Sequence, residues 1–287
     1  MFQYSSINPA AAGEGDMIRA SLLHRLNWIG IRNGGSTTLA SVDGLMKSSG
    51  VSKHALGLKL KNDESGLYYF QHGHLQYAYK RKIMQGVLSG GIGLGYVNVG
   101  FKGDSVNLKN VPLGSYHVND DLFIPSTNVN GSNFDVNIGV WYTAPSFYVG
   151  VSYMNLTQPD LYWTETQDYK LKSTLYLAGG YKYSQANPKY VLKPSMLVKT
   201  DFVSTQIDFS TYLEYNEKYW GGLSYRFQDA IVVLAGLTIP GGINLGYSFD
   251  LPISQRGGWG SHELCLVYEF DLMLGKHKNK YKSIRIL

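Results

Sequence analysis

The chain has 287 residues, of which 44% are hydrophobic and 14% aromatic, with 33 glycines, 23 tyrosines and one cysteine. This apolar content excludes an intrinsically disordered chain, and the single Cys265 excludes a disulfide scaffold. The net charge of +5 comes from residues 276–287, which contain five basic residues and no acidic ones. Because the rest of the chain is neutral, we expect no nucleic-acid partner.

No stretch of the sequence qualifies as a membrane-spanning helix, since such a helix needs about 20 mostly apolar residues. The uncharged stretch 230–249 is interrupted by Pro240-Gly241-Gly242, and the stretch 86–101 is rich in glycine. Residues 1–12 have neither a basic start nor an apolar core, so we expect no signal peptide in this numbering.

Apolar and polar residues alternate along most of the chain, which is the period of a β-strand with two different faces. Helical spacing is nowhere sustained, so the expected class is all-β. In chain order the alternation predicts about fourteen strands, at 17–27, 34–46, 51–62, 67–80, 86–102, 133–143, 146–154, 171–184, 189–200, 205–215, 217–227, 229–238, 241–250 and 260–272. Most approach the ~10 residues that a tilted membrane-spanning strand requires.

The lengths of the connections also indicate a membrane barrel. Connections after even-numbered strands are short, whereas 103–132, 155–170 and 251–259, which follow odd-numbered strands, are long. One connection on the long side, around Gln228, is short. Short periplasmic turns and long extracellular loops are typical of outer-membrane barrels. We therefore predict a single antiparallel transmembrane β-barrel over residues 17–272, in contact with outer-membrane lipid.

The two faces of the predicted strands differ in chemistry. One face carries Leu, Ile, Val and Tyr, as a lipid-facing surface requires, while the other carries charged residues that would line a polar lumen. Asp208, Arg226, Asp250 and Glu263 all fall on the inward face, which predicts a network of lumenal ion pairs more than a selectivity ring. A soluble carbohydrate-binding β-sandwich, with the same charges facing solvent, is the alternative fold.

Catalytic and metal-binding patterns are weak. Ser261 and His262 are adjacent in a strand and so point to opposite faces, which prevents them from forming a nucleophile–base pair. His72 and His74 share a face but have no third ligand in reach, so we expect a solvated or interfacial pair. We predict no catalytic residue, metal or cofactor, and no enzyme.

Several strings resemble the PorP/SprF family of outer-membrane proteins, which serve the type IX secretion system of Bacteroidetes. Residues 7–13, INPAAAG, are similar to the family's NPAYAG, and residues 25–30, RLNWIG, to its RxQWxG. Ala11 replaces the tyrosine of the first motif and Asn27 the glutamine of the second. The similarity continues in order to about residue 272. The residues that carry it are Asn8, Pro9, Gly13, Arg25, Trp28, Asn62, Asp63, Gly66, Tyr225, Arg226, Asp229, Tyr247, Asp250 and Glu263.

Most residues of these motifs are expected to have structural roles. Asn8-Pro9 is biased away from helix and fits an extended or turning entry to the barrel, as a plug, a docking element or a plain N-terminal turn. Residues 62–66 have turn chemistry. Trp28 is expected to anchor a strand at the membrane interface.

The resemblance implies a non-enzymatic component of type IX secretion, located in the outer membrane with both termini periplasmic. Its implied partners are periplasmic ring or peptidoglycan-linked proteins and the C-terminal domains of secreted adhesins, in keeping with gliding motility and adhesin anchoring. The alternative function is an outer-membrane channel or transporter for small or hydrophobic solutes; inward Trp141, Tyr148 and Trp220 count against an open lumen.

This reading divides the chain into a periplasmic or plug-like segment (1–16), the barrel (17–272) and a basic periplasmic tail (273–287). Aromatic residues dominate the energetics of interfaces, so Tyr116, Phe123, Tyr162 and Trp163 in the long loops are the expected anchors for cargo. The tail is either a solvated end or an electrostatic contact for an acidic periplasmic partner or lipid phosphate. The basic residues proposed for that contact are Lys276, Lys278, Lys280 and Lys282.

Overall fold

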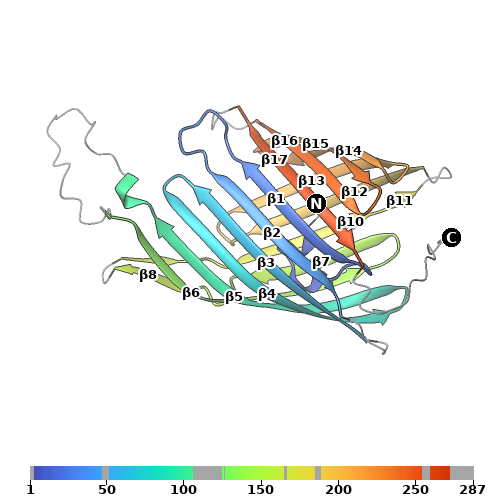
Figure 1. Ribbon diagram of the computed structural model, residues 1–287, viewed down its shortest axis with the longest axis horizontal. Coiled ribbons are helices and arrows are strands. Elements are labelled where there is room, and N and C mark those ends of the chain that lie inside the picture. Colours follow the sequence, from blue (N-terminus) through green and yellow to red (C-terminus); the bar gives the residue numbers. More distant parts are fainter. Residues whose placement is uncertain are drawn as a thin grey trace.

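The computed structural model describes residues 3–46, 52–105, 125, 127–164, 167–184, 189–253 and 259–271. Its dominant element is one antiparallel sheet in which each strand pairs with the next along the chain. Pairing of β1 with β17, and of β10 with β12, closes this sheet into a barrel (Figure 1). No helix among these residues has the length and apolar character to cross a membrane.

The barrel contains fourteen strands when the short β11 is counted as the continuation of β10, so the predicted fold and strand number are confirmed. They are β1 (Ile18–Leu26), β2 (Ser36–Leu45), β3 (Ser52–Ser65), β4 (Tyr68–Ile83), β5 (Gly86–Phe101), β6 (Val129–Thr143), β7 (Phe147–Met154), β10 (Thr174–Tyr181) with β11 (Tyr183–Ser184), β12 (Tyr190–Thr200), β13 (Thr205–Tyr215), β14 (Tyr219–Arg226), β15 (Ala230–Ile239), β16 (Ile243–Pro252) and β17 (Ser261–Phe270). The soluble β-sandwich alternative is wrong, because one closed sheet replaces two packed layers.

Among the described residues, five further elements lie outside this succession and were not predicted. Two short 3-10 helices, η1 (Tyr4–Ser6) and η2 (Pro9–Ala11), precede β1, and a third, η3 (Gly103–Ser105), follows β5. A separate two-stranded hairpin, formed by β8 (Asp160–Thr164) and β9 (Gln167–Lys170), lies within the connection between β7 and β10. In Figure 1 this hairpin lies beside β6 at the left end of the barrel.

Connections segregate by length, as predicted. The barrel strands are counted here in order around the barrel, with β10 and β11 as one strand and with β8 and β9 left out. The rim after the even-numbered strands of this count has only short turns, for example 84–85 and 216–218. The opposite rim has the long connections 27–35, 102–128 and 155–173. The turns 66–67, 201–204 and 227–229 on that second rim are short. The expected turn at 62–66 is wrong: β3 runs to Ser65, and Gly66, with a φ of 63°, turns the chain.

The outward face of the strands is apolar up to a sharp boundary. Leu60, Gly73, Tyr96 and Phe134 form one row of cross-strand partners on β3–β6, and the next outward row is Asn62, Gln71, Asn98 and Ser132. This change from apolar to amide and hydroxyl groups marks the edge of the hydrocarbon region. Strands β3–β6 therefore continue beyond the bilayer on the long-loop side, as an outer extension of the wall.

The inward face is polar and largely buried. Asp43, His74, Gln76 and Asp135 are each at most 5% exposed, although they belong to strands that surround a lumen. Something must cover these groups, since polar side chains are rarely buried without partners. Asp43 and Gln76 are covered by the chain's own N-terminal segment, residues 3–16, to which both form hydrogen bonds.

Candidate functional site in the barrel lumen and at its rims

The N-terminal segment lies inside the barrel, entering from the short-turn rim where β1 begins. Asn8, Ala10 and Ala12 are at most 2% exposed, and η2 contacts β4, β5 and β6. In Figure 1 the dark blue segment lies between the front and back walls. The described residues of this segment therefore fill the half of the lumen bounded by β2–β7.

The wall holds the N-terminal segment mainly through the segment's backbone carbonyls. Lys59 Nζ donates to Ser6 O at 3.1 Å, Gln76 Nε2 to Ser5 O at 2.7 Å, and Lys80 Nζ to Ala10 O at 3.3 Å. Because these contacts are made to main-chain oxygens, they do not depend on the side chains of the N-terminal segment. A change of side chain in the segment, such as Ala11 at the position of the family's tyrosine, is therefore tolerated.

Three positions of the first motif have side-chain or conformational roles. Asn8 Oδ1 accepts from Ala10 N at 2.9 Å and caps η2, with Pro9 at the first helical position. Asn8 Nδ2 donates to the carbonyl oxygens of the β6–β7 partners Val140 and Val151, at 3.0 and 3.1 Å. Gly13 adopts a φ of 64°, a conformation that favours glycine.

Asp43 of β2 fastens both ends of the segment. Its Oδ1 accepts from Ser5 Oγ at 3.0 Å, and its Oδ2 accepts from Gly13 N at 2.7 Å. A carboxylate with two such donors is well satisfied although it is buried. One side chain thus fixes the start and the end of the buried stretch.

Aromatic rings pack on the other side of the segment. The ring centroid of Tyr4 lies 5.1 Å from that of Trp141 and 4.8 Å from that of Tyr148, and the two tyrosine hydroxyls are 2.9 Å apart. Trp141 Nε1 donates to Thr143 Oγ1 at 2.9 Å and to Glu14 Oε1 at 3.3 Å. Trp141 and Tyr148 therefore obstruct the lumen together with the N-terminal segment.

His74 corrects the expectation of a solvated or interfacial histidine pair. Its side chain is 1% exposed, and Nε2 lies 2.9 Å from Asp135 Oδ2, an equally buried carboxylate of β6. The long strands β4 and β6 bring the two groups together, and Thr157 Oγ1, in the connection after β7, donates to Asp135 Oδ1 at 3.1 Å. Within the part of the chain that the structure describes, no group of three potential ligands could hold a metal ion.

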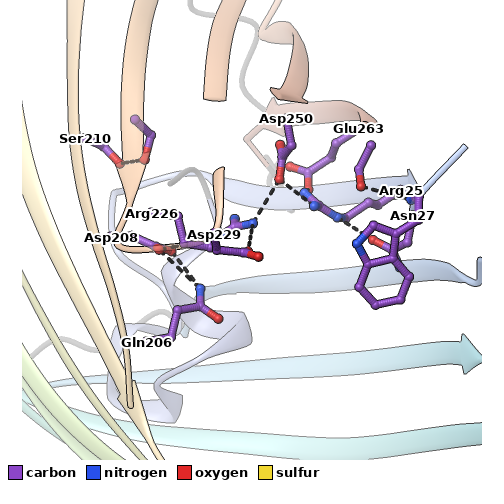
Figure 2. Close-up of polar contacts among 12 residues, drawn as sticks. Arg25, Asn27, Gln206, Asp208, Ser210, Arg226, Asp229, Asp250 and Glu263 are labelled. Carbon is purple, nitrogen blue, oxygen red and sulfur yellow. Dashed lines mark hydrogen bonds and ion pairs between the residues drawn. The ribbon is translucent and has the colours of Figure 1, made fainter. Parts of the chain in front are cut away.

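A second group of polar contacts lines the lumen near the long-loop rim (Figure 2). Arg226 of β14 contacts Asp208 of β13 at 3.2 Å and Asp250 of β16 at 3.0 Å, and also Asp229 at 3.4 Å. Arg25 of β1 contacts Glu263 of β17 at 3.4 Å and the same Oδ2 of Asp250 at 2.5 Å. We call these six residues the lumenal ion-pair network.

The network joins charged residues from five strands and one turn around the carboxylate of Asp250, whose side chain is 5% exposed. Each guanidinium serves two or more carboxylates, a geometry for which the forked arginine side chain is suited. Asn27 extends the network, because its Oδ1 accepts from Arg25 Nε at 2.7 Å. The predicted inward residues Asp208, Arg226, Asp250 and Glu263 are thus brought together, along with Arg25 and Asp229.

A cavity of about 250 Å³ separates the ion-pair network from the N-terminal segment. Gln3, Tyr4 and Ile7 line one side of it, and Arg25 and Arg226 line another. A second cavity, of about 360 Å³, also touches Tyr4 and reaches Arg19 and Glu269 at the ends of β1 and β17. The half of the lumen bounded by β10–β17 is therefore not filled by the N-terminal segment.

At the long-loop rim the β8–β9 hairpin folds against the inner face of the outer extension. Leu161 of β8 is fully buried with Val97 and Val99 of β5. Trp163 Nε1 donates to Val99 O at 3.0 Å, and its ring stacks on Tyr169. Of the two expected anchors in this loop, Trp163 is half-buried against the wall, whereas Tyr162 is 70% exposed.

The remaining motif residues have structural positions. Trp28 lies in the connection after β1 with a φ of 45°, not within a strand, and its N–H donates to Ser261 Oγ at 3.1 Å. Asp63 bonds Thr37 and Lys61 on the inward face. Tyr225 and Tyr247 face outward. Tyr247 contacts His262, so His262 also faces outward, whereas Ser261 is buried on the inward face.

Six of the predicted contact residues lie outside the described residues: Tyr116, Phe123, Lys276, Lys278, Lys280 and Lys282. Sequence reasoning also missed the residues that hold the N-terminal segment, namely Asp43, Lys59, Gln76 and Lys80. Their signal was present, because each is a polar residue at an inward position of an alternating strand. The sequence does not show that they share the N-terminal segment as a partner, because this segment is distant from them along the chain.

Comparison with known proteins gives a family and a fold. A family model described as type IX secretion system membrane protein PorP/SprF matches residues 1–268. Among curated proteins, no sequence matches the chain.

Similar solved structures include the Ralstonia pickettii toluene transporter TbuX, with 11% identity, a TM-score of 0.54 and 92% of each chain covered. The Pseudomonas putida toluene transporter TodX is also similar, with 11% identity, a TM-score of 0.55 and 93% of each chain covered. At such identities the likeness extends to the barrel fold alone.

Proposed function

Because the chain belongs to the PorP/SprF family of type IX secretion system membrane proteins, we propose that it is a non-enzymatic adaptor or anchor of the outer membrane. In this role it connects periplasmic ring or peptidoglycan-linked proteins with secreted surface cargo, such as the C-terminal domains of adhesins. The contacts are made at the two rims of a rigid barrel.

The observation that carries this proposal is the obstruction of the lumen. The N-terminal segment fills one half, and the ion pairs of Arg25 and Arg226 line the wall of the other half near the long-loop rim. A barrel whose lumen is half filled by its own chain is better suited to presenting surfaces than to conducting solutes. Residues 1–16 accordingly act as a plug, 17–272 as the barrel and 273–287 as a separate basic tail.

The orientation follows from the two rims. We place the long connections outside the cell and the short turns, with both termini, in the periplasm, as is usual for outer-membrane barrels. The outer extension of β3–β6 then stands above the outer leaflet, and its polar outward row lies just beyond the lipid.

Cargo contacts are assigned to the long loops. Tyr162 supports this assignment, since it is 70% exposed on a hairpin that is fastened to the wall. A rigidly held, exposed aromatic loses little entropy on binding. Trp163 serves as the fastening of that hairpin, and Tyr116 and Phe123 remain proposed anchors of the 103–132 connection.

Periplasmic contacts are assigned to the basic tail. Lys276, Lys278, Lys280 and Lys282 follow β17, whose last residue Phe270 lies at the short-turn rim. An acidic protein partner or lipid phosphate there would be attracted by about 1 kcal/mol per basic residue.

A channel or transporter is the second candidate function. The two lumenal cavities favour it, together with the fold shared with toluene transporters. Opening a path through the half that is filled would require the N-terminal segment to move.

The test is a mild-detergent pull-down of the tagged protein from outer membranes, read by mass spectrometry. Two variants are run in parallel: Tyr162→Ala, and a tail variant with all four of the named lysines changed to Gln. We expect Tyr162→Ala to lose secreted cargo and the tail variant to lose periplasmic partners. A barrel recovered alone from wild-type membranes contradicts the adaptor, and single-channel conductance then tests the channel.

A further inference from the structure

We propose that the 250 Å³ lumenal cavity is a binding site for one small, uncharged, largely apolar molecule of about the size of a substituted benzene. The inference goes beyond the adaptor role and does not depend on it, since a pocket in the lumen can hold a ligand whether or not the barrel conducts solutes.

Apolar side chains make up the larger part of this cavity's lining, in a lumen that is otherwise polar. Inward-facing Leu23, Leu39, Leu197, Val232 and Leu234 come from four different strands, β1, β2, β12 and β15. Ile7 and Tyr4 of the N-terminal segment also line it, and the polar part of the wall includes Ser195, Ser210, Ser224 and Ser248. A mainly apolar pocket with a smaller number of polar groups is the usual form of a small-molecule site.

Trp220 shapes the cavity by lying along the wall. A Cβ atom on Gly236 of β15 would collide with the Trp220 ring, and one on Gly246 of β16 would lie 3.1 Å from it. These two cross-strand partners therefore leave the space that the indole occupies. The ring lines both cavities and leaves the lumen beside it open, although a tryptophan at this position was expected to obstruct it.

The size of the cavity limits the ligand. Apolar cavities of about 150 Å³ in proteins bind benzene, so 250 Å³ accommodates a ring with a small substituent. The second cavity shares Tyr4, Trp220, Gly246 and Cys265 with the first and extends toward the short-turn rim. We assign entry to that side, because the charged groups of the ion-pair network line the other.

Charge excludes an anionic ligand. The cavity is bounded by the guanidiniums of Arg25 and Arg226 and by three carboxylates, those of Asp208, Asp250 and Glu263. Both arginines are already engaged by these carboxylates, and a further carboxylate would meet an excess of negative charge. A buried, unpaired anion is costly, so a neutral molecule is favoured over a fatty or aromatic acid.

The experiment measures binding of fluorobenzene and of 4-fluorobenzoate by 19F NMR to the full-length protein in detergent. Leu234→Trp fills the cavity directly, and Gly236→Ala places a Cβ atom in collision with both the Trp220 ring and Leu245 O, so that the ring and the neighbouring strand must shift. Gly221→Ala is the matched control, since its Cβ would meet only Leu234 O, at 3.7 Å. Unboiled gel mobility verifies that each variant is a folded barrel.

We expect saturable binding of fluorobenzene to the wild type and to Gly221→Ala, and roughly tenfold weaker binding to both cavity variants. The signal from detergent partitioning is common to all four proteins and cancels in the comparison. Equal binding by wild type and both folded cavity variants would overturn the proposal. Binding of 4-fluorobenzoate as tight as that of fluorobenzene would overturn the assignment of an uncharged ligand.

Discussion

Gly91 of β5 and Gly139 of β6 are cross-strand partners on the inner wall, and a Cβ atom on either would collide with the N-terminal segment. Gly91 lies under the backbone of Ala10, and Gly139 lies under the side chain of Asn8. The wall is therefore shaped to receive this segment, beyond offering it hydrogen-bond partners. The plug role proposed for residues 1–16 makes a direct prediction at these two glycines.

Gly139→Ala should displace the N-terminal segment while leaving the barrel closed, because over-packing of this kind costs about 1–3 kcal/mol. The readout is maleimide labelling of Ser5→Cys in a Cys265→Ser background, since Ser5 is 6% exposed. Gly90→Ala is the control, as its Cβ would meet nothing within 4 Å. Equal labelling rates in the two variants contradict a tightly fitted plug.

Arg226→Ala should destabilise the barrel by about 3 kcal/mol, because it leaves the Asp208 and Asp250 carboxylates without their shared cation. Lys102→Ala is the comparison: its pair with Glu64 has side chains 39% and 40% exposed and is worth about 1 kcal/mol or less. The measurement is the temperature at which the folded band disappears on unboiled gels. A loss no larger for Arg226→Ala than for Lys102→Ala would show that the network adds nothing to stability.

Trp163→Ala should release the β8–β9 hairpin, because the indole supplies both the bond to Val99 O and the stacking on Tyr169. Tyr162→Ala should leave the hairpin in place, since that side chain points away from the wall. Limited proteolysis of outer membranes distinguishes them: cleavage within 155–173 is expected to increase for Trp163→Ala alone. Increased cleavage in both would mean that Tyr162 is also structural.

The proposed orientation predicts which rim is accessible on intact cells. With Cys265→Ser as background, a membrane-impermeant maleimide should label Phe202→Cys, in the turn between β12 and β13. It should not label Met84→Cys, in the turn between β4 and β5, until the cells are lysed. Both side chains are well exposed, at 67% and 90%, so the difference reports the side of the membrane. The reverse labelling pattern would show that the barrel has the opposite orientation, with the short turns outside the cell.

Most of the fold was predictable from the alternation of apolar and polar residues along the chain. Leu58 and Leu60 face lipid while Lys59 between them faces the lumen, and this period of two is local information that any reader of the sequence has. The same local signal located all fourteen barrel strands. It failed at residues 62–65, because turn-forming residues there are held in strand by their partners on β2 and β4.

The functional site depended more on partners that are distant in the sequence. Inward positions of Asp208, Arg226, Asp250 and Glu263 were predictable from alternation, so their meeting could be anticipated. His74 was predicted to be solvated or interfacial and is buried against Asp135, because a strand pattern says which face a residue occupies but not what covers that face. The β8–β9 hairpin was missed because its short strands lie in a connection that has no long alternating run.

The sequence by itself determined that the chain is a membrane barrel of this family, since strand period, loop lengths and motif order are all properties of neighbouring residues. The tertiary structure alone decided that Asn8, Pro9 and Gly13 belong to a segment packed inside that barrel. It alone also decided that Trp220 lies flat over two glycines beside an open cavity. Both outcomes depend on contacts between residues many strands apart, for which the order of residues along the chain carries no direct signal.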